Sequence, residues 1–368
     1  MNSYRPSYCE INLAALRHNL RELQKKAGIA SLLPMIKANA YGHGAVNVAQ
    51  ALMEEKVKGL GVALFEEALQ LREAGIKCEL FCFGGLLGAS PQDFFHHQIT
   101  PVIFQPKDLK ILIQEKVELS FQLKVDTGMG RLGFFSDEIP AILAQIEKAP
   151  HLKLQGLLTH LARADENDPQ PSQNQIENFL SLKKLLRQKG KNIPCYHLAN
   201  SAALIEKRLN QTDWARPGIA LYGAYPHERL QKNIQLQPLL AWKSQIISLK
   251  DFPSGSPLSY GATFICPRPS RIAVMALGYA DGYSRQFSNC GKVLVCGQKA
   301  PVVGRVCMDL TLIDVTDIPQ AQLGSEVVVL GKQQGEELKA EELAQKINTI
   351  SYEIFCGISA RVPRVYLK

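Results

Sequence analysis

A lysine stands at the point where an apolar stretch of the chain gives way to a polar one. Lys37 closes the apolar run 32–37 and is followed by the string ANAYGHG at 38–44. A lysine at the end of a buried strand is desolvated, which disfavours its ammonium form and suits the neutral amine to Schiff-base chemistry or proton transfer. The same side chain could instead extend its ammonium group into solvent. Position alone leaves both interpretations open.

Two later loops combine residue types that bind phosphate. The string ANSAA at 199–203 follows an apolar run, and Ser201 is placed to cap the helix that comes next. In the string RPGI at 216–219, proline and Gly218 leave backbone N–H groups exposed. Exposed N–H groups and helix N-termini bind anions. Together the two loops predict a phosphate site.

The first two thirds of the chain have the pattern of repeated βα units around a parallel sheet. Apolar residues follow helical spacing over 139–148 and again over 175–189. Eight strands are predicted, at residues 32–37, 59–64, 78–83, 98–103, 121–126, 154–160, 193–200 and 213–216. Eight such units in about 230 residues predict an N-terminal (β/α)8 TIM-type barrel.

The pattern changes near residue 237 to short apolar strands separated by turn signals, which predicts a mainly-β C-terminal domain. One helix is expected at 339–347, and the strands at 242–249, 271–277, 292–295, 300–306, 311–315, 326–330 and 362–367. The predicted domains are therefore a barrel over 1–236 and a β-domain over 237–368. The first few residues are expected to be able to associate with the β-domain.

A closed barrel gives the candidate residues a common location. Reactive groups of such barrels lie at the C-terminal ends of the strands, and the loops after strands seven and eight commonly bind phosphate. Closure places strand eight beside strand one, so that Lys37 neighbours the predicted phosphate site. A lysine beside a phosphate site suggests a phosphorylated aldehyde cofactor.

Composition excludes several classes of protein. The chain has 368 residues, 46% hydrophobic and 21% charged, and its net charge of +8 comes from scattered basic residues. Two globular domains are expected, without a nucleic-acid or membrane-surface stripe. Nine cysteines without a C-x-x-C pair indicate neither a disulfide framework nor a zinc ribbon. With no signal-like N-terminus and no run of 18 apolar residues, a soluble cytoplasmic protein is expected.

Several features are more simply explained by structure than by chemistry. GMGRLG at 128–133 matches G-x-G-x-x-G, but no strand ends in an acidic residue at the spacing of a dinucleotide site, so a glycine turn that brings Arg131 to the barrel mouth is expected. No metal-ligand spacing accompanies the histidines, so no metal site is predicted and surface or helix positions are expected for His43, His96 and His97. Cys307, Met275 and Met308 are expected to be buried, and Tyr260 to be half-buried.

Longer strings extend these observations. They are LPMIKANAYGHG, KVDTGMGRLG at 124–133, LLTHLARAD at 157–165, ANSAA, RPGIALYG at 216–223, SYGATF at 259–264, LGYADGY at 277–283 and VGRVCMDLTLIDV at 303–315. In this order they strongly resemble the alanine racemase family, over residues 37–364. The resemblance implies the pyridoxal 5′-phosphate (PLP)-dependent interconversion of L-alanine and D-alanine, which supplies D-alanine for peptidoglycan. It also implies a homodimer with shared active sites.

The resemblance implies that PLP is bound to Lys37 as an internal aldimine. It assigns the cofactor phosphate to four residues, namely Tyr41, Ser201, Gly218 and Ile219. Arg216 would face the pyridine nitrogen. A guanidinium cannot accept a proton, so Arg216 would keep the ring nitrogen unprotonated and limit electron withdrawal by the cofactor. This limit suits a racemase, which must avoid transamination and decarboxylation.

Racemisation needs an acid on one face of Cα and a base on the other. Lys37 would serve one face, and the family places Tyr260 of the partner subunit on the other. Because a free tyrosine has a pKa of about 10, the family's candidates for a hydrogen-bond chain that assists it are His160 and Arg216.

The resemblance also implies which groups bind the substrate carboxylate. Arg131 would contact this carboxylate and the phenolic oxygen of the cofactor, and the Met308 backbone amide would lie near the same carboxylate. Lys124 matches a position that is carbamylated in family members and orients the arginine.

One position departs from the family pattern. Many members carry a tyrosine where this chain has Ala360, and that tyrosine contributes to the phosphate site and to a narrow entrance. We expect a wider entrance and weaker PLP binding here, while Tyr279 remains at the other entrance position.

Two other classes of function share the scaffold. A PLP-dependent decarboxylase also joins a barrel to a β-domain, but the expected long glycine-rich phosphate loop and cysteine motif are missing. A noncatalytic PLP carrier would explain Lys37 and the phosphate loops but would leave Tyr260 without a role. Within the racemases, the sequence leaves open the breadth of amino-acid specificity and the choice between a biosynthetic and a catabolic role.

Overall fold

The structure, a computed structural model, describes residues 5–208 and 212–368. The first four residues of the predicted N-terminal domain and residues 209–211 lie outside these ranges. The described chain divides into two compact units. The barrel unit contains Leu16–Ala40 and Ala45–Leu236, and the β-unit contains residues 5–15, Tyr41–Gly44 and Gln237–Lys368.

All eight predicted barrel strands form, and they make one parallel sheet in the order β2-β9-β8-β7-β6-β5-β4-β3. Their bounds are β2 (Ser31–Leu32), β3 (Gly59–Val62), β4 (Glu79–Cys82), β5 (Ile99–Ile103), β6 (Leu119–Lys124), β7 (Leu152–Leu158), β8 (Tyr196–Ala199) and β9 (Trp214–Ala215). A parallel bridge between Met35 and Gly61 joins the two ends of this order. The predicted TIM-type barrel is therefore confirmed.

The first barrel strand is shorter than the predicted run 32–37, although its backbone pairing continues. The Met35 N–H donates to the Pro217 carbonyl at 2.9 Å, on the β9 side, and the Ile36 N–H donates to Gly61 at 2.8 Å, on the β3 side. These bonds hold the segment extended as far as the residue before Lys37. They fix the backbone from which the candidate catalytic lysine projects.

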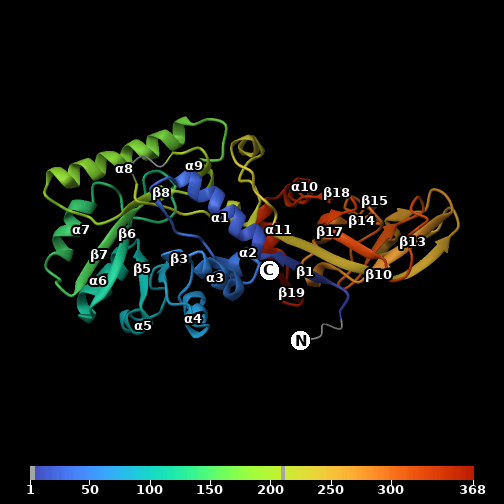
Figure 1. Cartoon of the computed structure of the whole chain (residues 1–368), viewed down its shortest axis with the longest axis horizontal. Coiled ribbons are helices and arrows are strands. Elements are labelled where there is room, and N and C mark those ends of the chain that lie inside the picture. Colours follow the sequence, from blue (N-terminus) through green and yellow to red (C-terminus); the bar gives the residue numbers. More distant parts are fainter. Residues whose placement is uncertain (1–4, 209–211) are drawn as a thin grey trace. The chain divides into compact units, whose positions relative to one another are not determined.

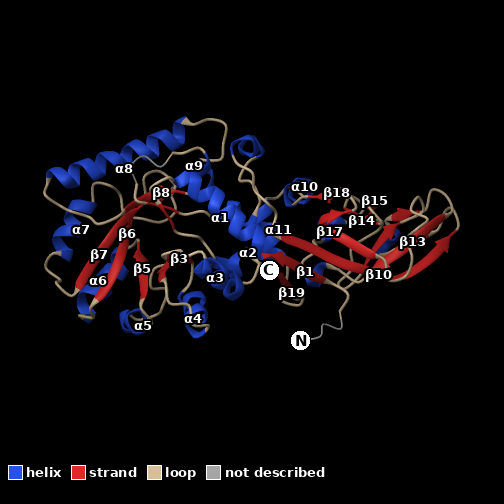
Figure 2. Ribbon diagram, in the orientation of Figure 1, coloured by secondary structure: helices blue, strands red, loops and turns tan. Residues whose placement is uncertain are grey.

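Helices cover the outside of the barrel strands (Figures 1 and 2). Their bounds are α1 (Leu13–Ala27), α3 (Ala45–Glu54), α4 (Phe65–Glu73), α5 (Pro91–His96), α6 (Pro106–Glu115), α7 (Ile139–Ile146), α8 (Gln170–Gln188) and α9 (Ser201–Ile205). The predicted helix at 139–148 is confirmed by α7, which buries the apolar face formed by Ile139, Ile142, Leu143 and Ile146. The predicted start of α8 at 175 was too late, because the helix begins at a Pro-containing first turn that carries no apolar periodicity.

The β-unit is built on a nine-stranded sheet with a central path β15-β14-β17-β10-β1-β19. Its strands are β1 (Tyr8–Asn12), β10 (Leu240–Phe252), β13 (Ser270–Met275), β14 (Lys292–Val295), β15 (Gln298–Pro301), β16 (Thr311–Asp314), β17 (Glu326–Gln333), β18 (Glu336–Leu338) and β19 (Arg364–Leu367). A two-stranded sheet, β11 (Pro257–Leu258) and β12 (Phe264–Ile265), lies outside this path. Near the start of the chain, β1 pairs with both β10 and β19 (Figure 1).

Two details of the β-unit differ from the prediction. The expected strand 300–306 ends at Pro301, because the chain then turns at Gly304, whose φ of +74° and close approach to Ser259 leave no room for a side chain. The expected helix at 339–347 is confirmed by α10 (Ala340–Lys346), but a second helix, α11 (Ser351–Gly357), follows it and was missed. None of the described helices is long and apolar enough to cross a membrane.

Candidate active site

The extended segment that precedes Lys37 leads into a turn with left-handed backbone conformation. The turn α2 (Lys37–Tyr41) has φ values of 51°, 53° and 53° at Ala38, Asn39 and Ala40. Left-handed helical backbone costs roughly 1–2 kcal/mol per non-glycine residue. Strain of this kind persists only where surrounding contacts enforce it, and it concentrates at functional sites.

Three hydrogen bonds within the barrel unit enforce this turn. The Ala40 N–H donates to the Ile36 carbonyl at 2.8 Å, and the Asn39 Oδ1 accepts from the Ala45 N–H at 2.8 Å. The Ala38 N–H donates to the Glu67 carboxylate at 2.6 Å. Glu67 also accepts backbone N–H groups at the start of α4, so one carboxylate connects the lysine turn to the neighbouring helix.

Tyr41, the predicted phosphate ligand at the end of this turn, belongs to the β-unit and is buried. Burial, followed by the nearby Tyr352 and Cys356, raises the pKa of Tyr41, so its hydroxyl remains a hydrogen-bond donor. His43 is also buried, so the expectation that it occupies a surface or helix position was wrong. Its Nδ1 donates to the Tyr41 carbonyl at 2.8 Å, and its ring packs edge-on against Phe355.

The predicted phosphate loops meet at Ser201 in the barrel unit. Its Oγ accepts hydrogen bonds from the Gly218 N–H at 2.9 Å and the Ala220 N–H at 3.4 Å. The prediction that Ser201 caps α9 was wrong, because the cap is Asn200, whose Oδ1 accepts from the Ala203 N–H. The Ser201 hydroxyl therefore bonds the loop of Gly218 and the short 3-10 helix that begins at Ile219, and not the N-terminus of α9.

A buried guanidinium lies at the centre of the barrel site. Arg216 donates to the carbonyls of Thr159 at 2.6 Å and Leu198 at 3.2 Å, and to the Nδ1 of His197 at 2.7 Å. No carboxylate pairs with it in residues 5–208 and 212–368. Burial lowers the pKa of Arg216 to about 10, so it remains a cation at neutral pH.

The partner of this guanidinium is itself held in one protonation state. Because Arg216 can only donate, the Nδ1 of His197 is an acceptor and its proton resides on Nε2. That Nε2 donates to the Gln122 Oε1 at 2.8 Å. Burial, and next the charge of Arg216, lowers the pKa of His197 well below its ordinary value.

Electrostatics shows which predicted side chains share this neighbourhood. Burial lowers the pKa of Lys124 to about 8, assisted by the charges of Arg131, Arg216 and Lys37. Burial also lowers the pKa of His160 well below normal, with further contributions from Arg216, Lys124, Arg131 and Lys37 in that order. The Nδ1 of His160 lies 3.4 Å from Arg216. The structure therefore gathers five predicted barrel residues into one cationic cluster, which consists of Lys37, Lys124, Arg131, His160 and Arg216.

Two side chains outside the predictions connect the strand ends of this cluster. The Thr127 hydroxyl, after β6, lies 2.8 Å from the Thr159 hydroxyl, after β7. From α8, Gln175 donates to the His160 carbonyl at 3.1 Å and accepts from the Ala162 N–H at 2.8 Å. The loops that carry Arg131 and His160 are thereby connected.

The predicted residues of the β-unit lie on exposed turns. Tyr260, Tyr279 and Met308 are 70%, 42% and 53% exposed. The Tyr279 N–H donates to the Cys307 carbonyl at 3.0 Å, and the Ala280 N–H donates to the Met308 carbonyl at 2.9 Å, so the two turns are joined.

Three burial expectations in the β-unit were wrong, and one is confirmed. Tyr260 is exposed on a tight turn that begins at Ser259, whose φ is 62°. Met308 is exposed because it occupies a turn closed by a hydrogen bond from Cys307 to Leu310, and Cys307 itself is only partly buried. Met275, inside β13, is fully buried as expected.

Comparison with known proteins decides the family. A model described as the alanine racemase N-terminal domain matches residues 11–226, and one described as the alanine racemase C-terminal domain matches residues 239–366. The chain belongs to the alanine racemase family. Family membership confirms the resemblance of the sequence strings and agrees with the observed barrel and β-unit.

Alanine racemases from several bacteria are similar over their full length. "Alanine racemase 2" of Caldanaerobacter subterraneus subsp. tengcongensis is 40% identical, with 99% of this chain and 95% of the relative covered. The alanine racemase of Halothermothrix orenii is 40% identical, with 98% and 97% covered.

Solved alanine racemase structures have the same fold. The Bacillus anthracis enzyme with bound L-Ala-P superposes with a TM-score of 0.92 at 32% identity, covering 100% of this chain and 96% of that one. The enzyme of the D-cycloserine producer Streptomyces lavendulae gives 0.93 at 32% identity, covering 100% and 98%.

The family motifs located the charged residues, but several side chains that hold them in place were missed. These are Glu67, Gln122, Asp126, Gln175 and His197. Asp126 lies within the string KVDTGMGRLG, and Glu67 follows the predicted strand 59–64. The role of both residues depends on hydrogen bonds that their carboxylates accept from backbone N–H groups, which the sequence does not show. The pairing of Gln122 with His197 spans 75 residues and carries no local signal.

Mildly acidic pH is expected to destabilise the protein through its two neutral site histidines. Below a pH of about 6.5, the unfolded chain binds protons that folded His160 and His197 do not. The free energy of unfolding should therefore fall by about 1.4 kcal/mol per pH unit for each histidine, until the pH reaches the depressed folded pKa. Denaturant unfolding of the cofactor-free protein as a function of pH measures this slope.

Two variants separate the contribution of one histidine. His197→Gln keeps an acceptor for Arg216 but cannot titrate, so its slope should be shallower by the contribution of one proton. His96→Gln makes the same substitution at an exposed position of α5 and serves as the matched control. An unchanged slope in His197→Gln would show that this histidine is not kept neutral.

Proposed function

We propose that this chain interconverts L-alanine and D-alanine with PLP held at the mouth of its barrel. The observation that carries the proposal is the cationic cluster around Arg216, a buried guanidinium without a carboxylate partner among the described residues, beside the extended segment that leads into Lys37. Such a cluster suits a cofactor with a phosphate and a basic ring nitrogen, and a substrate with a carboxylate. The alanine racemase relatives support the choice of reaction.

The residues of the barrel site fit PLP by the chemistry of their donors. The hydroxyl of Ser201 and the backbone N–H of Gly218, with the start of the 3-10 helix at Ile219, would hold the phosphate. The Lys37 amine would bind the aldehyde carbon, and Tyr41 keeps the phosphate contact that the family gives it. When bound, PLP makes the proton on the substrate Cα acidic.

Arg216 would control the protonation of the cofactor ring. Its guanidinium only donates hydrogen bonds, so as the partner of the PLP ring nitrogen it would leave that nitrogen unprotonated. The two carbonyls and His197 that accept from Arg216 fix the side chain in place without neutralising its charge. Restraint of the cofactor in this way favours racemisation over reactions that need a stronger electron sink.

Two groups exchange the proton of Cα from opposite faces. The Lys37 Nζ serves one face, and the hydroxyl of the partner subunit's Tyr260 serves the other. The exposure of Tyr260 supports this assignment, because a catalytic tyrosine of another subunit must project from its own chain. Exposed Tyr279, Met308 and Leu310 add apolar surface of the kind that a second subunit covers. We therefore propose a homodimer with shared sites.

Arg131 and the Met308 backbone amide would bind the substrate carboxylate, and Arg131 would also hold the phenolic oxygen of PLP. Lys124 is carbamylated and orients Arg131. The lowered pKa of Lys124 supports the modification, because only a neutral amine attacks carbon dioxide. His160 and Arg216 complete the hydrogen-bond chain toward the tyrosine.

We place the reaction in the cytoplasm, where D-alanine is needed as a precursor of peptidoglycan. All nine cysteines lie within the described ranges, and none is paired there in a disulfide, as suits a reducing compartment.

Mixing two inactive variants tests whether active sites are shared. Lys37→Ala and Tyr260→Ala should each lose nearly all racemisation, since each removes one of the two proton-exchanging groups. A hybrid dimer contains one intact site, so an equal mixture should recover roughly a quarter of the parent activity after random subunit exchange. No recovery, despite exchange demonstrated with tagged subunits, would refute a shared site.

Tyr260→Phe should preferentially slow proton exchange from the L-enantiomer. Deuterium incorporation from D2O, measured separately for L-alanine and D-alanine, tests this assignment, and equal incorporation from both enantiomers would contradict it.

Carbamylation of Lys124 is expected to follow its lowered pKa. With a pKa of about 8, roughly half of the amine is neutral at pH 8 and about 1% at pH 6. Carbon-13 NMR of the protein in labelled bicarbonate should show a carbamate signal that disappears in Lys124→Arg. Lys183→Arg is the matched control, because Lys183 is also a buried lysine with a lowered pKa. A parent spectrum without the signal would remove this part of the proposal.

Ala360 should weaken cofactor binding relative to a tyrosine at the same position. The residue is exposed and lies in a segment fixed by the ion pairs of Arg361 with Asp309 and Asp281, so a larger side chain can be added without repacking. Ala360→Tyr should tighten PLP binding about fivefold, the effect of one hydrogen bond of about 1 kcal/mol, while Ala360→Phe should not. Spectroscopic PLP titration measures both, and equal affinities for the parent protein and Ala360→Tyr would rule out the effect.

A further inference from the structure

The turn that carries Arg131 is closed at its base by two backbone hydrogen bonds. The chain leaves β6 at Lys124 and returns at Phe134, whose N–H donates to the Lys124 carbonyl at 3.0 Å. The Asp126 N–H donates in turn to the Phe134 carbonyl at 2.9 Å. A Cβ at Gly133 would lie 2.5 Å from the Asp126 nitrogen, so this close approach requires glycine.

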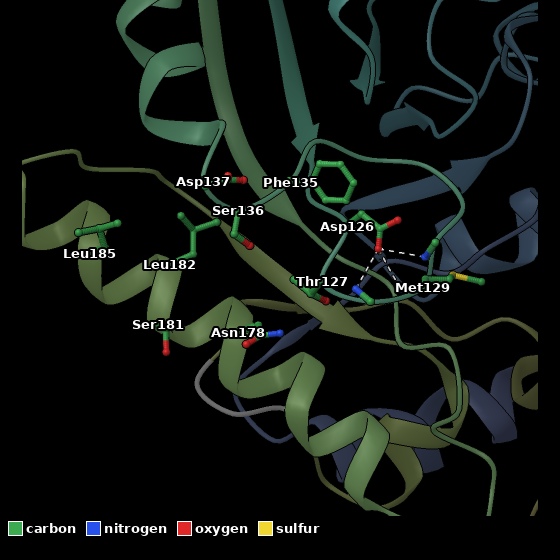
Figure 3. Close-up of a pocket in the computed structure, with 12 residues that line it drawn as sticks. Asp126, Thr127, Met129, Phe135, Ser136, Asp137, Asn178, Ser181, Leu182 and Leu185 are labelled. Carbon is green, nitrogen blue, oxygen red and sulfur yellow. Dashed lines mark hydrogen bonds between the residues drawn. The ribbon is translucent and has the colours of Figure 1, made fainter.

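Inside the turn, one carboxylate collects four consecutive backbone donors. The Oδ1 of Asp126 accepts from Gly128 at 2.9 Å, Met129 at 2.8 Å and Gly130 at 3.1 Å (Figure 3). Its Oδ2 accepts from the Arg131 N–H at 3.1 Å. Burial alone would raise the pKa of Asp126, but these bonds outweigh it and hold the pKa below its ordinary value. The carboxylate is therefore ionised throughout the neutral range.

Packing provides little to hold the turn on its outer side. A groove of about 920 Å³ lies there, between the turn and α8, and Asp126, Met129, Phe135 and Leu182 are among its lining residues (Figure 3). No atom lies within 4 Å of a Cβ built on Gly130. The conformation of the turn therefore depends on the carboxylate at its centre more than on side-chain contacts.

The Asp126 carboxylate forms no ion pair with the Arg131 side chain in the described residues. Both oxygens of Asp126 are occupied by backbone N–H groups. The positive charge of Arg131 acts on Lys124 and His160, which places it toward the site. An acid next to an anion-binding arginine would normally neutralise it, but this acid is already saturated with donors.

We propose that Asp126 is the positioning residue for Arg131. It fixes the arginine backbone so that the guanidinium faces the site, and it does not itself compete with the carboxylate of the substrate for that guanidinium. The inference rests on the proposed function, in which Arg131 binds that carboxylate. It adds a residue that touches neither substrate nor cofactor and acts through the shape of the turn.

Asp126→Asn tests the proposal with the smallest change. An asparagine has one acceptor oxygen, so it can retain the donors on Oδ1 but presents an NH₂ group to the Arg131 N–H. In the PLP-loaded enzyme, KM for alanine should rise about tenfold, with a smaller change in kcat, as expected for loss of substrate binding. Asp137→Asn is the matched control, because Asp137 is exposed on the same groove and the charge change is equal. It should keep the parent KM.

A second readout does not depend on activity. Amide hydrogen exchange at residues 128–131 of the cofactor-free protein should be at least about tenfold faster in Asp126→Asn and unchanged in Asp137→Asn, because the four N–H groups lose their ionised acceptor. Parent-like exchange in Asp126→Asn would overturn the proposal, whatever the kinetic result.

A further variant separates this inference from the role of Arg131 itself. Arg131→Lys should raise KM while leaving amide exchange in the turn unchanged. If Arg131→Lys raises KM and Asp126→Asn does not, positioning by Asp126 is wrong and the proposed function stands. If Arg131→Lys keeps the parent KM, the carboxylate role of Arg131 is wrong.

Asp126→Glu keeps the test decisive if the asparagine variant does not fold. It retains the charge and both acceptor oxygens but displaces them by one methylene. A raised KM together with faster exchange supports the proposal, and parent values of both overturn it.

Discussion

The guanidinium of Arg216 is removed from water, and no carboxylate in the described part of the chain balances its charge. The rest of the barrel site is arranged around that charge. Burying a cation is costly unless hydrogen bonds replace its hydration. Here the carbonyls of Thr159 and Leu198 and the Nδ1 of His197 do so. Because these acceptors are neutral, the positive charge remains. Burial is the largest cause that lowers the pKa of His160, His197 and Lys124, and the charge of Arg216 adds to it in each case. The site is thereby prepared for anionic and basic ligand groups.

Two acids near the site accept hydrogen bonds from backbone N–H groups. They are Glu67 and Asp126. Glu67 holds the left-handed turn after Lys37, and Asp126 holds the glycine turn before Arg131. Carboxylates thus hold the backbone of both loops that carry cationic side chains of the site.

Much of the fold follows from patterns that are local in the sequence. The eight barrel strands were predicted because each is a short apolar run, and α7 because its apolar residues repeat every three or four positions. Lys37 was found because strand ends are recognisable, whereas Arg216 was assigned through the resemblance to the family. Much of what failed depends on contacts between distant segments. The burial of His43 against Phe355 and the pairing of Gln122 with His197 have no local signature. The capping of α9, by contrast, is local, but Asn200 and Ser201 are both N-cap residue types and the pattern does not choose between them. Exposure of Met308 likewise follows from a turn that apolar character alone cannot reveal.

The most direct test of the account is to incubate the protein, reconstituted with PLP, with L-alanine in D2O and to determine both the chirality and the deuterium content of the product. Removal of the proton from Cα on one face and its return on the other predicts D-alanine deuterated at Cα, approaching an equal mixture with L-alanine. A protein that binds PLP at Lys37 but leaves L-alanine undeuterated and unconverted would contradict the assignment of alanine racemisation to this site.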